Sequence, residues 1–311
     1  MKMFTTITFC AALVTGALSW SYTGDDGVDH WADDYETCGG MRQSPIDIDT
    51  DYALDCDDSL IDFEFHGYDS AGLGLKLKNN GHAAQVDVSE GASISGGGLH
   101  ENYLLAQFHM HWGSNSGQGS EHLLNGHEYP MEVHFVHFAE SRGSLGEAAD
   151  KPFGLAVLGF FFEIGEHNDN FDEIVNNLAQ VREQTQSGQE YTLNSFALST
   201  LLPQESSPTY YRYHGSLTTP GCFQSVIWTV FETPIHISEE QMEQFRMLTH
   251  EDDEGHSHAI VDNYRPPQDL NGRNIFTNKM MAGPDPPSSA TSVVVSMMSL
   301  VVSLVLAKLM C

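Results

Sequence analysis

The sequence contains little positive charge. Only 13 of its 311 residues are Lys or Arg, against 43 Asp or Glu, and the formal net charge is −30. Such a chain repels the phosphates of nucleic acids and the anionic face of a membrane, so we expect neither as a binding surface. Net charge does not determine fold, and solubility or adaptation to salt is its simplest explanation.

Cysteine is also scarce, and no Asn-x-Ser/Thr site for N-glycosylation occurs. Five cysteines in a chain that is 41% hydrophobic exclude both a disulfide-stapled miniprotein and a disordered polymer. Cys10 and Cys311 lie in terminal segments that we expect to be removed, which leaves Cys38, Cys56 and Cys222. An odd number in an oxidising compartment indicates one disulfide and one free thiol, and the sequence alone does not choose the pair.

The two longest apolar stretches of the sequence lie near its two ends, and both are short. A basic start, an apolar stretch over 4–18 and the small residues Ala17 and Ser19 predict a signal peptide over 1–19, cut before Trp20. A buried N-terminal helix is the alternative. The predicted compartment is therefore the secretory pathway.

The C-terminal segment, 283–311, combines a Pro/Ser spacer with an apolar tail over 293–307. The tail is shorter than the roughly 20 residues of a spanning helix. Small residues, a spacer and a terminal apolar tail predict a GPI-attachment signal, and hence a lipid anchor at the outer face of the plasma membrane. A short transmembrane anchor, with which Lys308 is compatible, and a secreted protein without an anchor are the alternatives.

Residues 20–282 are predicted to form one domain, because they contain no linker or repeat. Short alternating segments at 62–65 and 73–78 are typical of strands. Continuous apolar runs at 155–162 and 226–231 are typical of central strands that are covered on both faces. The predicted fold class is mainly β, with a large central sheet and peripheral helices.

Two helices are predicted at the periphery. The first spans 171–181, with Asp169 or Asn170 as its N-cap. The second begins at Ser238, which with Gln241 fits a capping box, and its predicted buried residues are Met242, Phe245 and Leu248.

Three of the 16 histidines indicate chemistry. His109 and His111 are two apart on a strand-like segment, so their side chains point to one face. His134 lies on a second such segment, at a distance that suits a neighbouring antiparallel strand. Three neutral imidazoles on a rigid sheet form a tetrahedral zinc site with one open position, which is the catalytic arrangement. Ordinary surface or core histidines are the alternative.

Several motifs surround these histidines in a fixed order. They are 43–48 (QSPIDI), 79–82 (NNGH), 107–113 (QFHMHWG), 119–122 (GSEH), 132–137 (EVHFVH), 216–220 (SLTTP) and 263–268 (NYRPPQ). Together they resemble the motifs of the alpha-class carbonic anhydrases, in particular the secreted or membrane-anchored, GPI-linked members. The resemblance runs from about Tyr22 to Phe276 and covers essentially the whole domain.

The resemblance implies a single domain on a mostly antiparallel, twisted sheet of about ten strands, with Zn2+ at the bottom of a conical cleft. It implies a zinc lyase that reversibly hydrates CO2 to bicarbonate and a proton. His109, His111 and His134 would hold the zinc, and a zinc-bound hydroxide would attack CO2.

The same resemblance implies roles for the surrounding residues. Thr218 would accept the proton of the hydroxide and donate its own to Glu121, because an ionised carboxylate only accepts, and the Thr219 amide would polarise the substrate. Hydrogen bonds would orient the three rings, from His109 to Gln107, from His134 to Glu132 and from His111 to the carbonyl of Asn263. The apolar wall for CO2 would consist of Val136, Val157, Leu217 and Trp228.

Proton removal would depend on His82, since a histidine titrates near neutral pH. Tyr22, Asn80 and Gln85 match the positions that order the water chain to this shuttle. Cys38 and Cys222 match the family's disulfide, which makes Cys56 the predicted free thiol.

Two other functions are consistent with the sequence. One is a non-catalytic relative that serves as a binding module, which loss of a zinc ligand would have favoured. The other is an acidic biomineral-matrix protein with weak calcium association. The histidine-rich and acidic segment 250–258 is predicted to be a solvated loop, with weak binding of calcium or a transition metal as the alternative.

Overall fold

A computed structural model describes residues 20–278, except 51–53, 58, 185–188, 195, 203, 204, 206 and 253. The predicted signal peptide and the predicted C-terminal anchor therefore lie outside the described residues. Within the described part of the chain, no helix is both long and apolar enough to cross a membrane.

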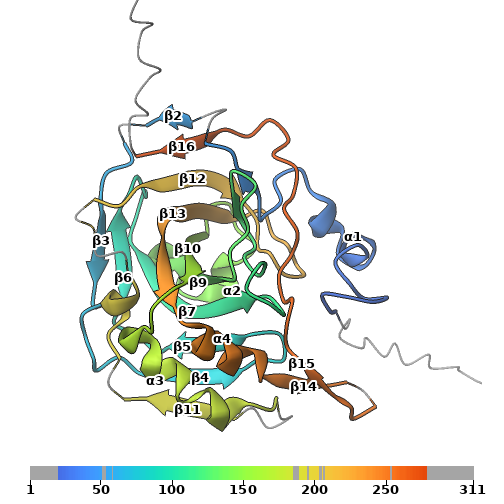
Figure 1. The fold of residues 1–311 in the computed structure, drawn as a ribbon. Coiled ribbons are helices and arrows are strands. Elements are labelled where there is room, and N and C mark those ends of the chain that lie inside the picture. The colour runs from blue at the N-terminus through green and yellow to red at the C-terminus, as the bar shows by residue number, and fades with distance from the viewer. Residues whose placement is uncertain are drawn as a thin grey trace, which may run out of the picture. The chain divides into compact units, whose positions relative to one another are not determined.

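A twelve-stranded mixed sheet forms the centre of the fold (Figure 1). Its order is β11-β4-β5-β7-β9-β10-β13-β12-β16-β2, and β3 and β6 pair beside this path. Most neighbours are antiparallel, while β10–β13 and β16–β2 are parallel. The predicted mainly β class on one large, mostly antiparallel sheet is confirmed.

The strands of this sheet have the following bounds. They are β2 (Leu54–Cys56), β3 (Phe63–His66), β4 (Leu75–Asn79), β5 (Ala84–Val88), β6 (Ser93–Gly96), β7 (Tyr103–Trp112), β9 (Met131–Ala139), β10 (Leu155–Ile164), β11 (Glu190–Leu193), β12 (Tyr210–Gly215), β13 (Val226–Ile237) and β16 (Ile275–Thr277). Two short pairs lie outside it: β1 (Asp47–Ile48) with β8 (Leu123–Leu124), and β14 (Thr249–Glu251) with β15 (Ser257–Ala259).

The alternation of side chains along β7 separates the core from the site. Phe108, Met110 and Trp112 are fully buried in the larger hydrophobic cluster. The residues between them therefore point to the opposite face of the sheet, where His109 and His111 meet. A second, smaller cluster lies on this opposite face and contains Val136, Val157 and Trp228 among its members.

Strand β10 is buried on both faces over its first eight residues, as its continuous apolar run predicts. Gly159 on this strand lies opposite His134 of β9. A Cβ at this position would lie 3.0 Å from Glu132 Oε1, so a glycine leaves room for the carboxylate beside the histidine.

The helices are short. They are α1 (Trp31–Asp34), η1 (Glu36–Gly39), η2 (Glu140–Arg142), α2 (Leu145–Ala148), η3 (Asp169–Phe171), α3 (Asp172–Val175), η4 (Leu178–Val181), η5 (Leu198–Leu201) and α4 (Glu239–Arg246). The prediction for α4 is confirmed: Ser238 and Gln241 form the capping box, and Met242, Phe245 and Leu248 are buried.

The single helix predicted over 171–181 is wrong. The structure has η3, α3 and η4 there, and the side chain of Asn168, instead of Asp169 or Asn170, accepts from the backbone at the start of η3. Asn177 donates to the carbonyl of Glu173 at 2.7 Å, and such side-chain bonds compete with a continuous helical ladder.

The Cys38–Cys222 disulfide is present and joins η1 to the loop before β13. The side chain of Cys56 lies outside the described part of the chain, so its free thiol stays a prediction.

Candidate metal site and its pocket

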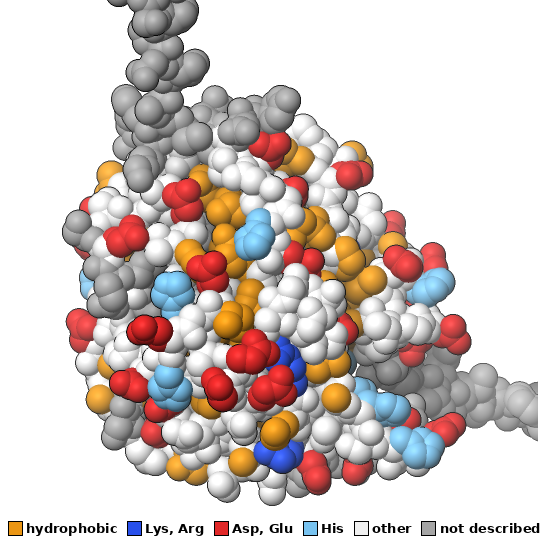
Figure 2. All heavy atoms as spheres, in the orientation of Figure 1, with side chains coloured by type: hydrophobic (Ala, Val, Ile, Leu, Met, Phe, Trp, Pro, Cys, Tyr) orange, Lys and Arg blue, Asp and Glu red, His pale blue; other side chains and the backbone are white. Residues whose placement is uncertain are grey.

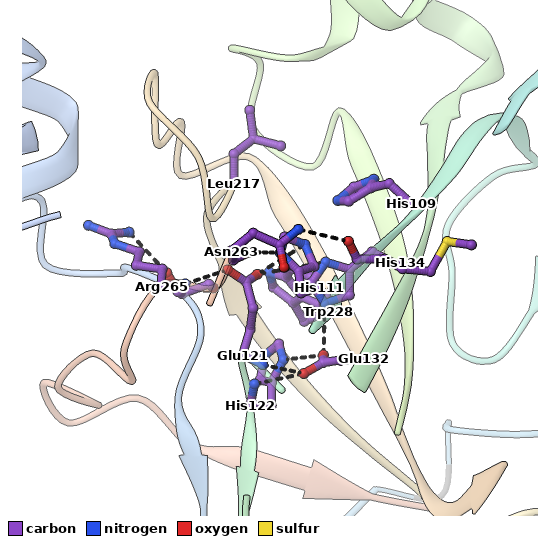
Figure 3. Close-up of polar contacts among 12 residues, drawn as sticks. His109, His111, Glu121, His122, Glu132, His134, Leu217, Trp228, Asn263 and Arg265 are labelled. Carbon is purple, nitrogen blue, oxygen red and sulfur yellow. Dashed lines mark hydrogen bonds and ion pairs between the residues drawn. The ribbon is translucent and has the colours of Figure 1, made fainter. Parts of the chain in front are cut away.

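Three imidazoles converge on one face of the central sheet. His109 and His111 come from β7, and His134 lies directly opposite His109 on the antiparallel strand β9 (Figure 3). Their ring centroids are 4.7 to 5.4 Å apart. One ligand nitrogen from each ring lies within 4.8 Å of the others, so the three can share one ion.

Hydrogen bonds determine which nitrogen of each ring is left for a metal. His109 Nδ1 donates to Gln107 Oε1 at 2.8 Å, and His111 Nδ1 donates to the carbonyl of Asn263 at 2.8 Å. His134 Nε2 donates to Glu132 Oε1 at 2.7 Å. The free nitrogens are therefore Nε2 of His109, Nε2 of His111 and Nδ1 of His134. The structure brings each ring together with its predicted hydrogen-bond partner.

The donor set fits a divalent metal ion. His111 is 1% exposed, and its Nε2 is one of three buried side-chain nitrogens or oxygens in the described chain without a hydrogen-bond partner. Burial first, and then the neighbouring imidazoles, lower the pKa of His109 well below its usual value. Burial likewise lowers the pKa of His111. These two rings are thus neutral at neutral pH, as metal ligands must be.

A second histidine–carboxylate cluster adjoins the first, formed by His122, Glu132 and His134. Here the candidate ligand atoms already bond one another. Glu132 Oε1 accepts from His122 Nδ1 and His134 Nε2 at 2.7 Å each, and Oε2 accepts two backbone N–H groups at 2.8 and 2.9 Å. This cluster therefore supports the triad and leaves no open position for an ion.

Glu132 is held ionised inside the protein. Burial alone raises a carboxyl pKa, but the charges and hydrogen bonds of His122 and His134 outweigh it, and the pKa of Glu132 lies well below its usual value. His122 also shares a 2.7 Å hydrogen bond with the hydroxyl of Tyr213. The sequence motif contains His122, but its role as a support for Glu132 was not predicted.

Glu121 is fully buried beside the triad (Figure 3). Its Oε1 accepts from the backbone N–H of Arg265 at 2.8 Å, while Oε2 lies 3.5 Å from His111 Nε2 and has no hydrogen-bond partner. The predicted hydrogen bond from Thr218 to Glu121 is not formed among the described residues, where Oε1 accepts from Arg265 and Oε2 has no partner. The role of Arg265 was not predicted.

A cavity of about 230 Å3 opens beside the triad. All four residues predicted for the apolar wall line it, together with Thr218 and Thr219. Further lining residues, which the sequence did not single out, are Leu145, Ala149 and Leu155. The cavity is therefore mostly apolar, with histidine and threonine groups on one side.

His82 lies near this site with its ring stacked on Trp20, at a centroid distance of 3.8 Å. Burial in this position, and then the charge of His250, lower the pKa of His82 to about 4. The stacked histidine is thus a poorer base at neutral pH than the sequence predicts. The contact with Trp20 was not predicted either.

Two of the three residues predicted to order the water chain, Asn80 and Gln85, are hydrogen-bonded to each other, whereas Tyr22 is not bonded to them. Asn80 Nδ2 donates to Gln85 Oε1 at 2.9 Å, and Asn80 Oδ1 accepts from the backbone of His82. Gln85 lies opposite His109 on the neighbouring strand β5. The Tyr22 hydroxyl is buried without a partner, and burial followed by the charge of Glu121 raises its pKa well above 10.

The chain is similar to known proteins of one family. The family model for the eukaryotic-type carbonic anhydrases matches residues 26–279. Carbonic anhydrase 12 of Homo sapiens is 38% identical over 265 residues, which cover 83% of this chain and 73% of the relative. Carbonic anhydrase 7 of Mus musculus is 42% identical over 266 residues, which cover 84% of this chain and 97% of the relative.

Homo sapiens carbonic anhydrase 7 shows the same 42% identity and the same coverage. A match over nearly the whole described domain, with the histidine triad on adjacent strands of the expected sheet, leaves one assignment. The protein belongs to the eukaryotic-type carbonic anhydrase family and is an enzyme of that family.

Proposed function

We propose that the protein is a zinc enzyme that interconverts CO2 and water with bicarbonate and a proton at the outer face of the plasma membrane. One observation carries the proposal. Three imidazoles, each with one nitrogen hydrogen-bonded, present their free nitrogens to one point beside a largely apolar cavity. Family membership supports the same reaction.

His109, His111 and His134 would hold the metal. Bound Zn2+ lowers the pKa of a coordinated water to near neutrality, so it supplies a nucleophile at physiological pH. Gln107, Glu132 and the carbonyl of Asn263 fix the orientation of the three rings, and Glu132 also raises the basicity of His134.

Thr218 and Glu121 would orient the nucleophile. Glu121 Oε2 is a buried, unpaired acceptor, which the hydroxyl of Thr218 would satisfy by donating a hydrogen bond to it. A threonine that donates to a carboxylate has only its lone pairs left, so it would accept a hydrogen bond from the attacking group. The Thr219 amide would then polarise the substrate.

The apolar wall suits CO2, a linear and apolar gas. Val136, Val157, Leu217 and Trp228 line the cavity together with His109 and His134. These apolar side chains contact CO2 but form no hydrogen bond with the nucleophile. They also form none with the charged product bicarbonate, which can therefore leave.

His82 would carry the released proton to solvent. With its pKa at about 4 it cannot take up that proton efficiently while it stacks on Trp20. We therefore infer that its ring leaves the stack in the working state. Asn80 stabilises the turn that contains His82 through hydrogen bonds to Gln85 and to the backbone of His82. Tyr22 would lie beside the water chain to this histidine.

Attachment to the membrane would depend on the segment 283–311, which supplies the small residues, spacer and apolar tail of a GPI signal. The test is release of the protein by phosphatidylinositol-specific phospholipase from cells that express the full chain. Release supports the lipid anchor, whereas retention on the membrane supports a short spanning segment.

A binding-module or mineral-matrix function is the second candidate, and the acidic surface favours it. Acidic side chains far outnumber basic ones on the face drawn in Figure 2. Such a surface concentrates calcium beside newly formed bicarbonate. Absence of calcium uptake at millimolar calcium would remove this role.

The test of the enzyme is stopped-flow CO2 hydration across pH on purified protein, with zinc measured in the same sample. We expect one zinc per chain and activity that rises through neutral pH, and we expect His134→Ala to lose both. His100→Ala, at an exposed loop position, is the control and should keep both. Bound zinc without hydration would favour the binding module.

A further inference from the structure

The β14–β15 hairpin carries a second group of metal-ligating side chains. His250 and His258 lie directly opposite each other in the antiparallel pair, so both project from the same side of the hairpin. Their ring centroids are 5.7 Å apart. This separation is slightly longer than the 4.7 to 5.4 Å between the rings of the histidine triad, so the side chains of the hairpin would have to turn inward to share one ion.

Asp252 lies at the turn of the same hairpin. Its Oδ2 is 2.9 Å from His258 Nε2 and 3.3 Å from His256 Nδ1. Its Oδ1 accepts the backbone N–H groups of Glu254 and His256 at 3.0 and 2.8 Å, which fixes the carboxylate. Hydrogen bonds from His258 and from the backbone hold the pKa of Asp252 well below its usual value, so it is an ionised ligand at neutral pH.

We propose that His250, Asp252, His256 and His258 form a second metal site, distinct from the catalytic triad, for a borderline divalent cation such as Zn2+, Cu2+ or Ni2+. Imidazole nitrogens select these ions, whereas Ca2+ requires six or more oxygens. The side chains of His256 and His258 are 66% and 53% exposed, so both can turn from Asp252 toward an ion.

The hairpin is attached to the turn that carries His82 (Figure 1). Asn79 Nδ2 donates to the carbonyl of Thr249 at 2.8 Å, and Asn79 Oδ1 accepts from the backbone of Gly81 at 2.9 Å. The charge of His250 already acts on His82. A divalent cation held by His250 therefore places more positive charge beside His82 and opposes its protonation. This consequence rests on the proposed function of His82 as the proton shuttle.

Calorimetric titration of the zinc-loaded full chain with Ni2+ tests the site. We expect one Ni2+ per chain to bind while the catalytic zinc, measured in the same sample, is retained. His258→Gln is expected to weaken this binding by at least about tenfold, as loss of a ligand or its partner does. Because His258 is an exposed side chain, the variant is expected to fold, and its circular dichroism spectrum checks this.

His66→Gln is the matched control. His66 is 54% exposed and lies 3.7 Å from the carboxylate of Glu64, but no second histidine stands opposite it. It should keep wild-type Ni2+ binding. The site is overturned if Ni2+ does not saturate one site, if His258→Gln binds as tightly as the wild type, or if Ca2+ binds in its place.

Kinetics test the coupling to His82. Saturating Ni2+ is expected to lower kcat several-fold and leave kcat/KM unchanged, because proton removal follows the hydration step, and His258→Gln should abolish the effect. Ni2+ binding without a change in kcat would overturn the coupling alone. Absence of CO2 hydration would instead overturn the proposed function, and the binding titration would still decide whether the site exists.

Discussion

His134 Nε2 donates a 2.7 Å hydrogen bond to Glu132 Oε1, an oxygen that also accepts from His122. This relationship leaves Nδ1 of His134 free for a metal ion and makes the imidazole more basic. The carboxylate is fully buried, so every one of its bonds is made with protein groups. The geometry around His134 thus depends on a side chain that would not itself touch the ion.

Glu132→Gln should therefore weaken zinc binding. A glutamine side chain has one oxygen that accepts hydrogen bonds. It therefore cannot accept all four hydrogen bonds that the carboxylate accepts from the two histidines and the two backbone N–H groups. We expect the affinity for zinc to fall by about 10- to 100-fold, measured by competition with a chromogenic chelator. Glu64→Gln, an exposed carboxylate on β3, is the control, and an unchanged affinity in Glu132→Gln would contradict the support role.

Trp20→Ala should raise the pKa of His82. The wild-type pKa of about 4 results first from burial, so removing the stacked indole readmits water and favours the charged ring. NMR titration of the His82 ring should show the pKa moving toward 6.5. Trp20→Phe keeps an aromatic ring over the imidazole and should retain most of the shift; equal values in the two variants would show that the stack is not the cause.

The buried residue His137 should make the protein sensitive to acid. Its Nδ1 faces the carbonyls of Phe135 and Ala156, so it carries the proton, and Nε2 accepts from the hydroxyl of Tyr68. Burial lowers the pKa of His137 to about 3. Above pH 6.5 both folded and unfolded states are neutral; as pH falls toward 3, only the unfolded state gains the proton, and stability is lost.

The expected cost from His137 is about 1.4 kcal/mol of unfolding free energy per pH unit below 6.5. Urea unfolding at pH 7.5 and pH 4.5 measures it. His137→Gln has no imidazole to titrate, so its difference between the two pH values should be smaller by about 2.7 kcal/mol. Parallel pH dependences for the two proteins would assign acid sensitivity to other groups.

The Cys38–Cys222 disulfide should stabilise both the chain and the loop beside the metal site. It spans 184 residues, for which the chain-entropy model gives about 5 kcal/mol. The backbone N–H of Cys222 also donates to the carbonyl of Thr219 at 2.9 Å. We expect the double Cys→Ser variant to unfold at much lower guanidinium concentration.

Cys56→Ser is the matched control for that experiment, because Cys56 is the predicted free thiol. It should unfold at nearly the wild-type guanidinium concentration. A loss comparable to that of the double variant would show that Cys56 has a structural partner.

Local pattern determined much of the site in advance. The alternation along β7 puts His109 and His111 on one face because a strand has a period of two, and this holds wherever the strand packs. The capping box at Ser238 is equally local, since its two hydrogen bonds lie within one turn. The motifs around these residues were sufficient to indicate the family.

Tertiary structure alone decided the partners that come from distant parts of the chain. The Arg265 N–H on Glu121 and the Trp20 ring on His82 each join residues that no local period relates and that the motifs did not predict. The helix predicted over 171–181 breaks for a similar reason, because its polar side chains bond nearby backbone and other elements. Periodicity determines which face a side chain occupies, whereas packing between elements determines what that face meets.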